Sequence, residues 1–409
     1  MKRFLVRSIS ELVTCAGGKK RGRAMGDAGV IPDGAFVVDG GIVRAVGTRR
    51  ELEAKYPGLP ALDCGGCLVT PGYVDSHTHL VFGGERSSEF VRRLRGEPYM
   101  AIMAAGGGIA ATVAATRAAT EQELAEAALP HLRRMLAMGV TTCEVKSGYG
   151  LDTETELRQL RAVARLNGMQ PVELIPTFLG AHAVPAGEDA DRYIDYCIAE
   201  SLPAAAESGL AAFADIFCEK GVFSLAQSER YLRRAAELGF RLKVHADEMS
   251  PLGGAGLAVR MGAVSADHLL QVKEEEVAAL AASETVAAVL PLTAFCLAER
   301  YAPARRLIDA GAALAVGSDF NPGSCCTCEI PLSIALCCIH MHMSIEETLT
   351  ALTVNGAAAC GCEDRVGSIE AGKQADFLVY SCPRKEFLPY RTGANLVRSV
   401  YKKGELVYG

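Results

Sequence analysis

The stretch VDSHTHL, residues 74–80, places two histidines two positions apart, just after the turn signal TPG. In an extended strand, residues i and i+2 point to the same side. His77 and His79 would therefore face one side together, as a pair that can chelate a metal ion. Because the chain contains only eight histidines, the next question is what else gathers beside this pair.

Apolar stretches recur along the middle of the chain, with helical stretches between most of them. Thr120 and Glu123 form a capping box at the start of one such helix, and Gly139 ends it. Near-continuous apolar strands that alternate with helices predict a parallel sheet covered by helices. Eight strands over roughly 250 residues predict an α/β protein with a (β/α)8 barrel of the TIM type. The expected strands are 73–80, 141–147, 172–182, 213–219, 241–248, 263–269, 285–291 and 312–319.

A doubly wound open sheet is the alternative fold, but no G-x-G-x-x-G motif follows the first strand. The Gly-rich GGGIAA at 106–111 follows no clear strand, so we interpret it as a loop. Residues 1–70 and 365–409 differ from the middle, because they contain short alternating strands and Gly-rich turns. We therefore expect one small domain built from 1–70 and 365–409, and a barrel domain at 71–364.

Charge and hydropathy argue against nucleic acid and membranes as binding partners. The net charge of −6 gives no basic face for nucleic acid. No apolar run reaches the roughly 18 residues that a membrane span needs, and the apolar part of the N-terminus is too short for a signal peptide. We expect a cytoplasmic protein that binds neither nucleic acid nor membrane.

The cysteines form a second pattern, since the chain has 15 of them. In a long chain without an export signal, thiols are more common than a disulfide framework. Cys325 and Cys328 have the C-x-x-C spacing, but no second pair lies at the distance of a zinc ribbon. We interpret the cluster Cys325, Cys326 and Cys328 as small buried residues rather than a thiolate metal site.

Polar side chains gather at the ends of the expected strands. In a barrel of this kind, catalysis takes place at the C-terminal ends of the strands. His340 and His342 lie beside a helical stretch, where i and i+2 do not share a face, so we assign them no function. The strand ends carry, in chain order, His77, His79, His182, His245, Glu248, Asp267, His268 and Asp319.

Four of these side chains suit a metal ion. One buried histidine alone is usually a satisfied core residue, but four costly polar groups at one place indicate a ligand set. Three imidazoles and a carboxylate suit a divalent transition ion such as Zn²⁺ or Fe²⁺, with a position left for water. The ion would lower the pKa of that water to about 7. The expected ligands are His77, His79, His245 and Asp319, with one ion per chain.

Glu248 and His268 are the expected catalytic groups. Glu248 follows the ligand His245 by three positions, and we expect it to carry a proton between the water and the leaving nitrogen. A partner of the ligand histidine is its alternative role. His268 is a candidate to orient the water or to stabilise the oxyanion. Asp267 is interpreted as an ordinary polar residue at a strand end.

Together these residues resemble the metal-dependent amidohydrolase superfamily, with H-x-H after strand one, H-x-x-E on strand five, His on six and Asp on eight. The likeness is closer still to the imidazolonepropionase family, over nearly the whole chain. It rests on VDSHTHLVFGGERSSEF, EVKSGYGL, PTFLGAHAVP, DIFCEKGVFS, KVHADE, SADHL and SDFNPGS. The resemblance implies hydrolysis of 4-imidazolone-5-propanoate to N-formimidoyl-L-glutamate in histidine degradation. It also implies a small β-sandwich from both chain ends, and a homodimer.

The resemblance assigns roles to single residues. His77, His79, His245 and Asp319 match the metal ligands, and Glu248 and His268 match the catalytic pair. The substrate-contacting positions are matched by Arg86, Tyr149, His182, Glu248, Asn321, Gly323 and Ser324.

The sequence itself agrees with a substrate that bears a carboxylate. Arg86 lies in the GGER loop after strand one, and a guanidinium can hold a carboxylate with two parallel hydrogen bonds. Without the resemblance, Arg86 would be interpreted as a solvated loop residue. Asn321, Gly323 and Ser324 follow Asp319 in a turn that could present backbone N–H groups.

Some features depart from the family pattern. Cysteines follow Ser324, and Ser76 stands where we expect proline. Binuclear relatives use a modified lysine on strand four, whereas this strand ends with Cys218, Glu219 and Lys220. We therefore favour one metal ion, and binding of a second stays open.

The sequence leaves two other functions open. A single-metal deaminase of a purine or pyrimidine ring would share the metal chemistry, but a neutral base has no carboxylate for Arg86. A non-catalytic scaffold is the remote alternative, and such a protein would be expected to lose metal ligands.

Overall fold

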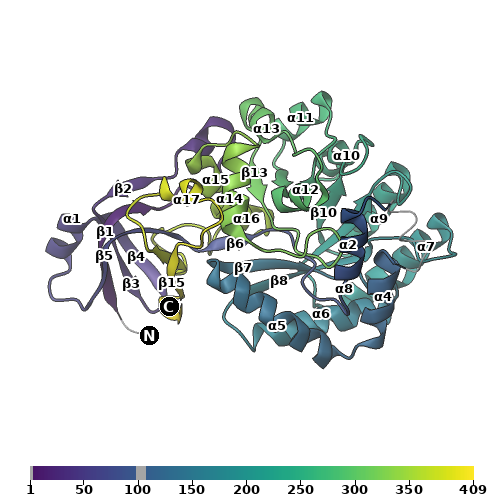
Figure 1. Cartoon of the computed structure of the whole chain (residues 1–409), viewed down its shortest axis with the longest axis horizontal. Coiled ribbons are helices and arrows are strands. Elements are labelled where there is room, and N and C mark those ends of the chain that lie inside the picture. Colours follow the sequence, from purple (N-terminus) through teal and green to yellow (C-terminus); the bar gives the residue numbers. More distant parts are fainter. Residues whose placement is uncertain (1–2, 98–106) are drawn as a thin grey trace.

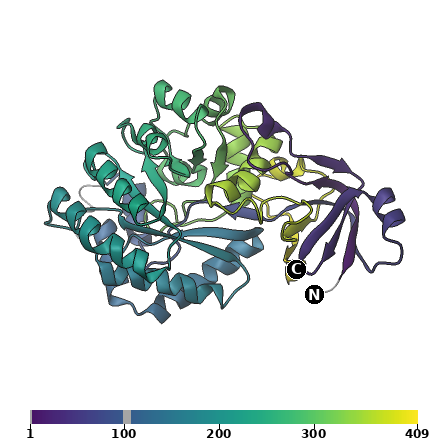
Figure 2. The ribbon, with the colours of Figure 1, turned by 180° about the vertical axis from the view of Figure 1, so that it is seen from behind.

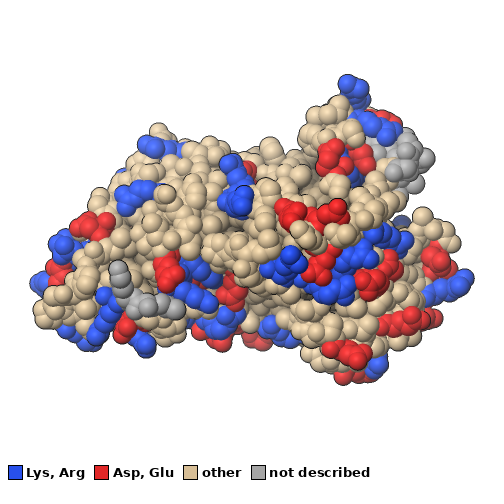
Figure 3. All heavy atoms as spheres, turned by 90° about the horizontal axis from the view of Figure 1, so that it is seen from below, with Lys and Arg blue, Asp and Glu red and all other residues tan. Residues whose placement is uncertain are grey.

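Figure 1 shows the computed structural model, which describes residues 3–97 and 107–409. The purple N-terminal strands and the yellow C-terminal strands lie side by side at one end of the molecule, and the barrel fills the other end in both Figure 1 and Figure 2. On the face shown in Figure 3, basic and acidic side chains are interspersed. Among the described residues, no helix combines the length and the apolar character that a membrane crossing requires.

The middle of the chain forms a closed barrel of eight parallel strands, in chain order around the ring. The ring closes beside the first strand, where Thr78 and Phe320 form a parallel bridge. The predicted (β/α)8 barrel is confirmed. Its strands are β6 (Tyr73–Asp75), β7 (Val140–Lys146), β8 (Glu173–Ala181), β9 (Phe213–Cys218), β10 (Arg241–Ala246), β11 (Ser265–His268), β12 (Val286–Val289) and β13 (Leu314–Val316).

The first barrel strand is shorter than the sequence predicts, because β6 ends at Asp75. The segment beyond it stays extended and is hydrogen-bonded to the chain beyond β13. The N–H of Asp319 donates to the carbonyl of His77 at 2.9 Å, and the N–H of His79 donates to the carbonyl of Phe320 at 2.8 Å. His77 and His79 are therefore held by the closure of the barrel rather than by a regular strand.

Helices cover the barrel, and several begin at the predicted caps. The capping box of Thr120 and Glu123 opens α5, and that of Ser344 and Glu347 opens α15. The helices are α1 (Arg49–Lys55), α2 (Ser87–Leu94), α4 (Ile109–Ala118), α5 (Glu121–Ala137), α6 (Thr153–Asn167), α7 (Ala190–Tyr196), α8 (Leu202–Ser208), α9 (Leu225–Glu237), α10 (Gly254–Arg260), α11 (Glu274–Ala281), α12 (Pro291–Leu297), α13 (Ala304–Ala310), α14 (Ile330–Ile339), α15 (Ile345–Leu352), α16 (Val354–Ala359) and α17 (Phe387–Tyr390), with a 3₁₀ turn η1 (Gly22–Gly26) and a π-helical turn η2 (Cys197–Ser201).

The interpretation of GGGIAA as a loop is wrong for its second half. Helix α4 begins at Ile109, so residues 109–111 are helical. Gly106 lies outside the described residues.

The two chain ends share one mixed sheet of eight strands. Its order is β16-β15-β14-β5-β1-β3-β4, and β2 pairs with β1. This confirms the predicted β domain built from both ends. The strands are β1 (Phe4–Val13), β2 (Val30–Pro32), β3 (Gly34–Asp39), β4 (Ile42–Thr48), β5 (Ala61–Pro71), β14 (Phe377–Tyr380), β15 (Val397–Lys402) and β16 (Glu405–Tyr408).

This sheet folds over its own apolar face. Phe36 on β3 and Phe377 on β14 are separated by two intervening strands, yet their ring centroids lie 5.0 Å apart in an edge-to-face contact. Ile42 on β4 also bridges Gln374, just before β14. The two halves of the sheet therefore enclose a core, as in a sandwich.

We predict that Phe377→Ala destabilises this terminal domain by about 3–5 kcal/mol, because a fully buried ring leaves a cavity. Denaturant unfolding, followed by circular dichroism, measures the loss. Tyr390→Ala is the matched control, because Tyr390 is 82% exposed. Equal stability of the two variants would show that the Phe36–Phe377 contact does not hold the folded sheet together.

Candidate active site

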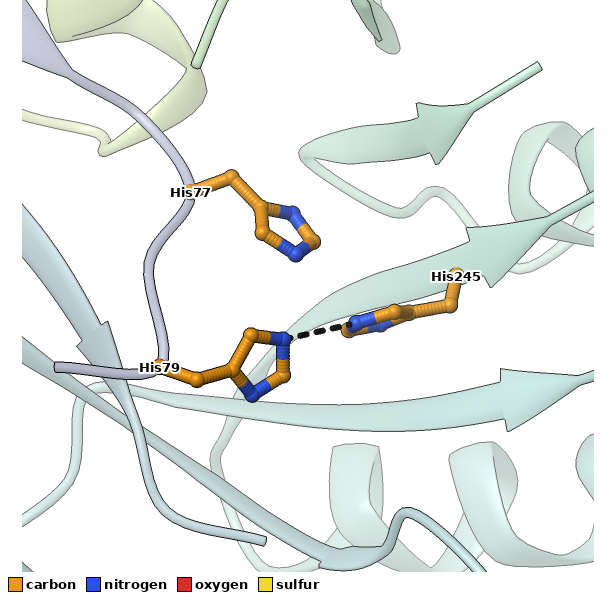
Figure 4. Close-up of side chains that lie close together, drawn as sticks. All are labelled: His77, His79 and His245. Carbon is orange, nitrogen blue, oxygen red and sulfur yellow. Dashed lines mark hydrogen bonds between the residues drawn. The ribbon is translucent and has the colours of Figure 1, made fainter. Parts of the chain in front are cut away.

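The side chains of His77, His79 and His245 point toward one another at the C-terminal end of the barrel (Figure 4). The two Nε2 atoms of His79 and His245 lie 3.4 Å apart. Asp319 Oδ1 lies 3.6 Å from His77 Nε2 and 3.7 Å from His79 Nε2. All four residues are buried. The structure thus brings the four predicted ligands into one cluster.

Carboxylates beneath the cluster lie against two of these imidazoles. Asp267 Oδ2 lies 2.6 Å from His77 Nδ1, and Asp215 Oδ2 lies 3.0 Å from His245 Nδ1. The hydrogen bond to Asp267 places the ring proton of His77 on Nδ1 and leaves a bare lone pair on its Nε2. Burial, followed by Lys146 for His77 and by His182 for His79, lowers the pKa of both rings well below its usual range. The rings are therefore neutral and suited to bind a cation.

The spacing of these atoms fits a metal ion. The Nε2 atoms of His79 and His245 lie 3.4 Å apart. A tetrahedral ion with bonds of about 2.0–2.1 Å separates its ligand atoms by about 3.3–3.4 Å, close to the distances observed. Within the described residues, His77 Nε2 also has no hydrogen-bond partner.

The charges around the cluster fit a divalent ion. The connected ion pairs contain four carboxylates and two ammonium groups, an excess of two negative charges that a divalent cation would neutralise. These groups are Glu144, Asp215, Asp267, Asp319, Lys146 and Lys243.

The two carboxyl oxygens of Asp319 face different groups. Its Oδ2 accepts a hydrogen bond of 2.6 Å from the hydroxyl of Thr293, which leaves Oδ1 facing the imidazoles. Burial raises the pKa of the Asp319 carboxyl to about 6. A cation beside this carboxylate would favour its ionised form.

Lys146 forms the centre of the buried charges beneath the ligands. Its Nζ lies 2.8 Å from Glu144 Oε1, 2.8 Å from Asp215 Oδ2 and 3.6 Å from Asp267 Oδ2. Although burial opposes the charged form, these carboxylates raise the pKa of Lys146 above its usual value. Lys146 therefore contacts both carboxylates that orient ligand histidines.

Sequence reasoning missed this layer. Asp267 was interpreted as an ordinary polar residue, and Lys146 and Asp215 were not considered. The available signal was a charged residue inside an apolar strand, as in TTCEVKS and FADIF. Carboxylates that hold ligand histidines are a common feature of metal sites.

The predicted catalytic pair lies beside the ligand cluster. Glu248 Oε2 is 3.6 Å from His268 Nδ1, and the rings of His268 and His77 have centroids 5.3 Å apart. Burial first, and then the charges of Asp319 and Glu219, raise the pKa of Glu248 to about 8. Burial lowers the pKa of His268. A protonated carboxyl and a neutral imidazole thus lie together at neutral pH.

Tyr149 and His182 form one wall beside the ligands. The rings of His182 and His79 are stacked, with centroids 4.8 Å apart and an interplanar angle of 14°. Tyr149 contacts His182 with ring centroids 5.3 Å apart. The structure therefore brings both predicted substrate contacts to the metal cluster.

Arg86 and the loop after β13 also meet. The Nε of Arg86 donates to Glu89 Oε2 at 2.9 Å. A Cβ atom placed on Gly323 would lie only 2.2 Å from Arg86 Nη1, so the guanidinium rests against this glycine. Glycine at position 323 leaves the space that Arg86 occupies.

Asn321 shapes this loop from within. Its Oδ1 accepts hydrogen bonds from the N–H groups of Gly323 and Ser324, at 2.9 and 2.8 Å. We expected the turn to present these N–H groups, but in this structure they are paired with Asn321. Ser324 Oγ also lies 2.8 Å from Asn321 Nδ2.

The cysteines lie outside the cluster. All 15 are free thiols, and no group of candidate metal ligands in residues 3–97 and 107–409 includes a cysteine. Cys325 and Cys328 are buried, whereas Cys326 is exposed. The interpretation as small buried residues is confirmed for Cys325 and Cys328 but is wrong for Cys326, whose side chain reaches the surface.

A cavity of about 700 Å³ opens at the opposite end of the barrel, where β10, β11 and β12 begin. Two of its cations are paired with carboxylates: Lys19 contacts Glu284 at 2.6 Å, and Lys373 contacts Glu370 at 3.3 Å. A third, Arg241, donates to the carbonyl oxygen of Gly361 at 3.1 Å. None of the four predicted metal ligands lines this cavity.

Comparisons with known proteins agree with the class that this barrel and ligand set define. The family described as "Amidohydrolase family" matches residues 88–408, and "Imidazolonepropionase-like composite domain, bacteria" matches residues 34–58. The imidazolonepropionase of Parabacteroides distasonis is 50% identical over 99% of this chain and 98% of its own length. That of Symbiobacterium thermophilum is 49% identical over 99% of this chain and 97% of its own length.

Solved structures agree with the fold. An adenosine deaminase from Xanthomonas campestris with bound zinc superposes with a TM-score of 0.71 at 19% identity, over 98% of this chain and 92% of that one. The guanine deaminase of E. coli gives a TM-score of 0.69 at 17% identity, over 100% of this chain and 99% of that one. The chain belongs to the imidazolonepropionase family of amidohydrolases.

We predict that the purified protein carries about one divalent transition ion per chain, and that His245→Ala loses most of it, because one of four ligands is removed. Elemental analysis of dialysed protein measures the content. His340→Ala is the control, since His340 lies outside the cluster and is exposed. Full occupancy in His245→Ala would exclude His245 as a ligand.

Proposed function

We propose that the barrel hydrolyses the ring C–N bond of 4-imidazolone-5-propanoate to give N-formimidoyl-L-glutamate, with one divalent ion held by His77, His79, His245 and Asp319. The observation that carries this proposal is the cluster of imidazole nitrogens and a carboxylate at the functional end of the barrel, in a chain of this family. When bound, such an ion acidifies a coordinated water molecule and so supplies a nucleophile near neutral pH.

Glu248 is the residue that we assign to proton transfer. Burial, together with nearby negative charge, raises its pKa to about 8 when no ion is bound, and a divalent ion beside it would favour the ionised form. The ionised carboxylate takes a proton from the attacking water and delivers it to the leaving ring nitrogen. The neutral imidazole of His268, 3.6 Å away, donates an N–H to the oxygen that gains negative charge.

Arg86 is assigned to the propanoate group of the substrate. Its guanidinium side chain is only 11% exposed, so a carboxylate held there would be shielded from water and strongly bound. The adjacent loop of Asn321, Gly323 and Ser324 would close over the same end of the substrate. Tyr149 and His182 would contact its ring.

The other two candidate functions would require different residues at the site. A deaminase of a purine or pyrimidine ring has no use for a buried guanidinium, and the likeness to solved deaminases shows only a shared fold. A non-catalytic scaffold has no reason to keep four converging ligands. The decisive assay follows the loss of ultraviolet absorbance of enzymatically generated 4-imidazolone-5-propanoate, beside ammonia release from purines and pyrimidines.

Metal identity, assembly and location are the finer parts of the proposal. We propose Zn²⁺ or Fe²⁺ as the ion, because imidazole and carboxylate ligands suit both. A cytoplasmic location is supported by 15 cysteines that remain thiols. A homodimer follows from the family resemblance, and analytical ultracentrifugation tests it.

We predict that Arg86→Ala weakens binding of the propanoate substrate by about 2–5 kcal/mol, because one partner of a shielded charge pair is removed. Steady-state kinetics should show the change in KM. Arg95→Ala is the control, since Arg95 is an exposed arginine at the end of the same helix. A KM that stays normal in Arg86→Ala would favour the deaminase alternative.

We predict that Glu248→Gln folds, keeps its metal and binds substrate, because glutamine has nearly the same shape and can still hydrogen-bond but cannot ionise. Hydrolysis should fall by at least ~10²-fold, the usual scale for loss of a general acid–base group. Most of the loss should lie in kcat, because the interaction forms chiefly in the transition state.

This prediction is tested by measuring the metal content and the steady-state kinetics of one preparation of Glu248→Gln. Intact metal with a near-normal kcat would limit Glu248 to its alternative role beside His245. His268 would then have to move the proton.

A further inference from the structure

The loop that carries Tyr149 is held by one face of helix α6. Glu156 Oε1 accepts hydrogen bonds from the N–H groups of Gly150 and Leu151, at 2.7 and 2.8 Å, and Oε2 accepts one from Gly148 at 2.7 Å. Gln159, one turn further along the helix, accepts from the N–H of Tyr149 at 3.2 Å through Oε1. Four consecutive N–H groups therefore end on two side chains of one helix.

This loop has a conformation that needs such an anchor. Gly148 has a φ of 114° and Leu151 a φ of 53°, both in the left-handed region. The N–H groups are buried, and a buried donor without a partner is costly. Glu156 is only 1% exposed, and its two oxygens accept all three of these bonds. The carboxylate thus fixes the backbone on both sides of Tyr149.

The same loop fixes the protonation of His182. The Nδ1 of His182 lies 2.9 Å from the carbonyl oxygen of Gly148. A carbonyl only accepts, so Nδ1 carries the ring proton and Nε2 keeps its lone pair. His182 therefore offers Nε2 as a hydrogen-bond acceptor beside the predicted metal ligands.

We propose that Glu156 is a positioning residue: it holds the loop of residues 148–151 so that His182 is fixed as an acceptor for a ring N–H of the substrate and Tyr149 stays packed against it. This inference rests on the proposed function and adds a recognition rule to it. The substrate must present an N–H donor to His182 while its carboxylate reaches Arg86. A ring with only acceptors on that edge would be rejected.

Glu156→Gln is the direct test. Glutamine has the same size, but one carboxyl oxygen is replaced by an amide NH₂ group, which cannot accept a hydrogen bond. At least one of the three backbone N–H groups that Glu156 accepts then loses its partner, and the loop is held less firmly. We expect KM to rise at least about ten-fold, with kcat changed much less and with the metal content unchanged.

A second readout follows His182 without substrate. Nitrogen-15 NMR of the imidazoles should show a single Nδ1–H tautomer for His182 in the wild type and a mixture of tautomers in Glu156→Gln. His182→Gln identifies the signal. A residue that only stabilised α6 would lower the unfolding temperature and leave this tautomer unchanged.

Two further variants make the test specific. Glu154→Gln changes a carboxylate in the same turn of α6 whose side chain is 66% exposed, and it should match the wild type. Gly148→Ala leaves Glu156 intact, but its Cβ would lie 2.9 Å from His182 Nδ1. It should reproduce the KM and tautomer changes even if Glu156→Gln does not fold.

The outcomes separate this inference from the proposed function. If the wild type hydrolyses the imidazolone and Glu156→Gln keeps both its KM and the His182 tautomer, Glu156 is not a positioning residue. If the wild type does not turn over the imidazolone, the proposed function fails, and the recognition rule fails with it. A tautomer change in Glu156→Gln would then still show that Glu156 positions His182.

Discussion

The ammonium group of Lys146 is the contact on which the rest of the site depends. It joins carboxylates from three barrel strands, Glu144 on β7, Asp215 on β9 and Asp267 on β11. A fully buried charge is costly unless several partners surround it. Asp267 in turn accepts the hydrogen bond that places the ring proton of His77 on Nδ1, and Asp215 lies 3.0 Å from Nδ1 of His245. The metal-ligand geometry is therefore determined one layer below the ligands.

Side chains that accept several hydrogen bonds also anchor three loops at this end of the barrel. In each of these loops a buried or partly buried acceptor takes two or more backbone N–H groups. Glu219 accepts from Met249 and Ser250, next to Glu248, as Glu156 and Asn321 do for their loops. Loops are otherwise the mobile part of a barrel. Acceptors of this kind let short irregular segments position catalytic side chains as firmly as strands would.

The sequence predicted what depends on local pattern. The eight apolar strands and the capped helices are local features, and all eight strands were located. The first strand was predicted too long because residues beyond Asp75 make only scattered backbone hydrogen bonds, with Lys146 on one side and with Asp319 and Phe320 on the other. Helix α4 was missed because its small residues give no clear apolar stripe.

The layer beneath the metal ligands could not be predicted for a different reason. Lys146 and Asp215 are 69 residues apart in the chain, and only the closed barrel brings their charges together. A single sequence shows each as an isolated polar residue in an apolar strand. The four side chains predicted as ligands do lie together, because the strand ends of a barrel meet at one rim.

The arrangement of charge would couple a bound divalent ion to the folded structure. Burial lowers the pKa of His77 and His79 and raises that of Asp319, so in each case the charged form is disfavoured when no ion is bound. A divalent cation would supply the positive charge that the rings do not carry. Since the unfolded chain has no such site, the binding free energy of the ion would add to the free energy of folding. The buried polar groups that could bind an ion therefore destabilise the ion-free form.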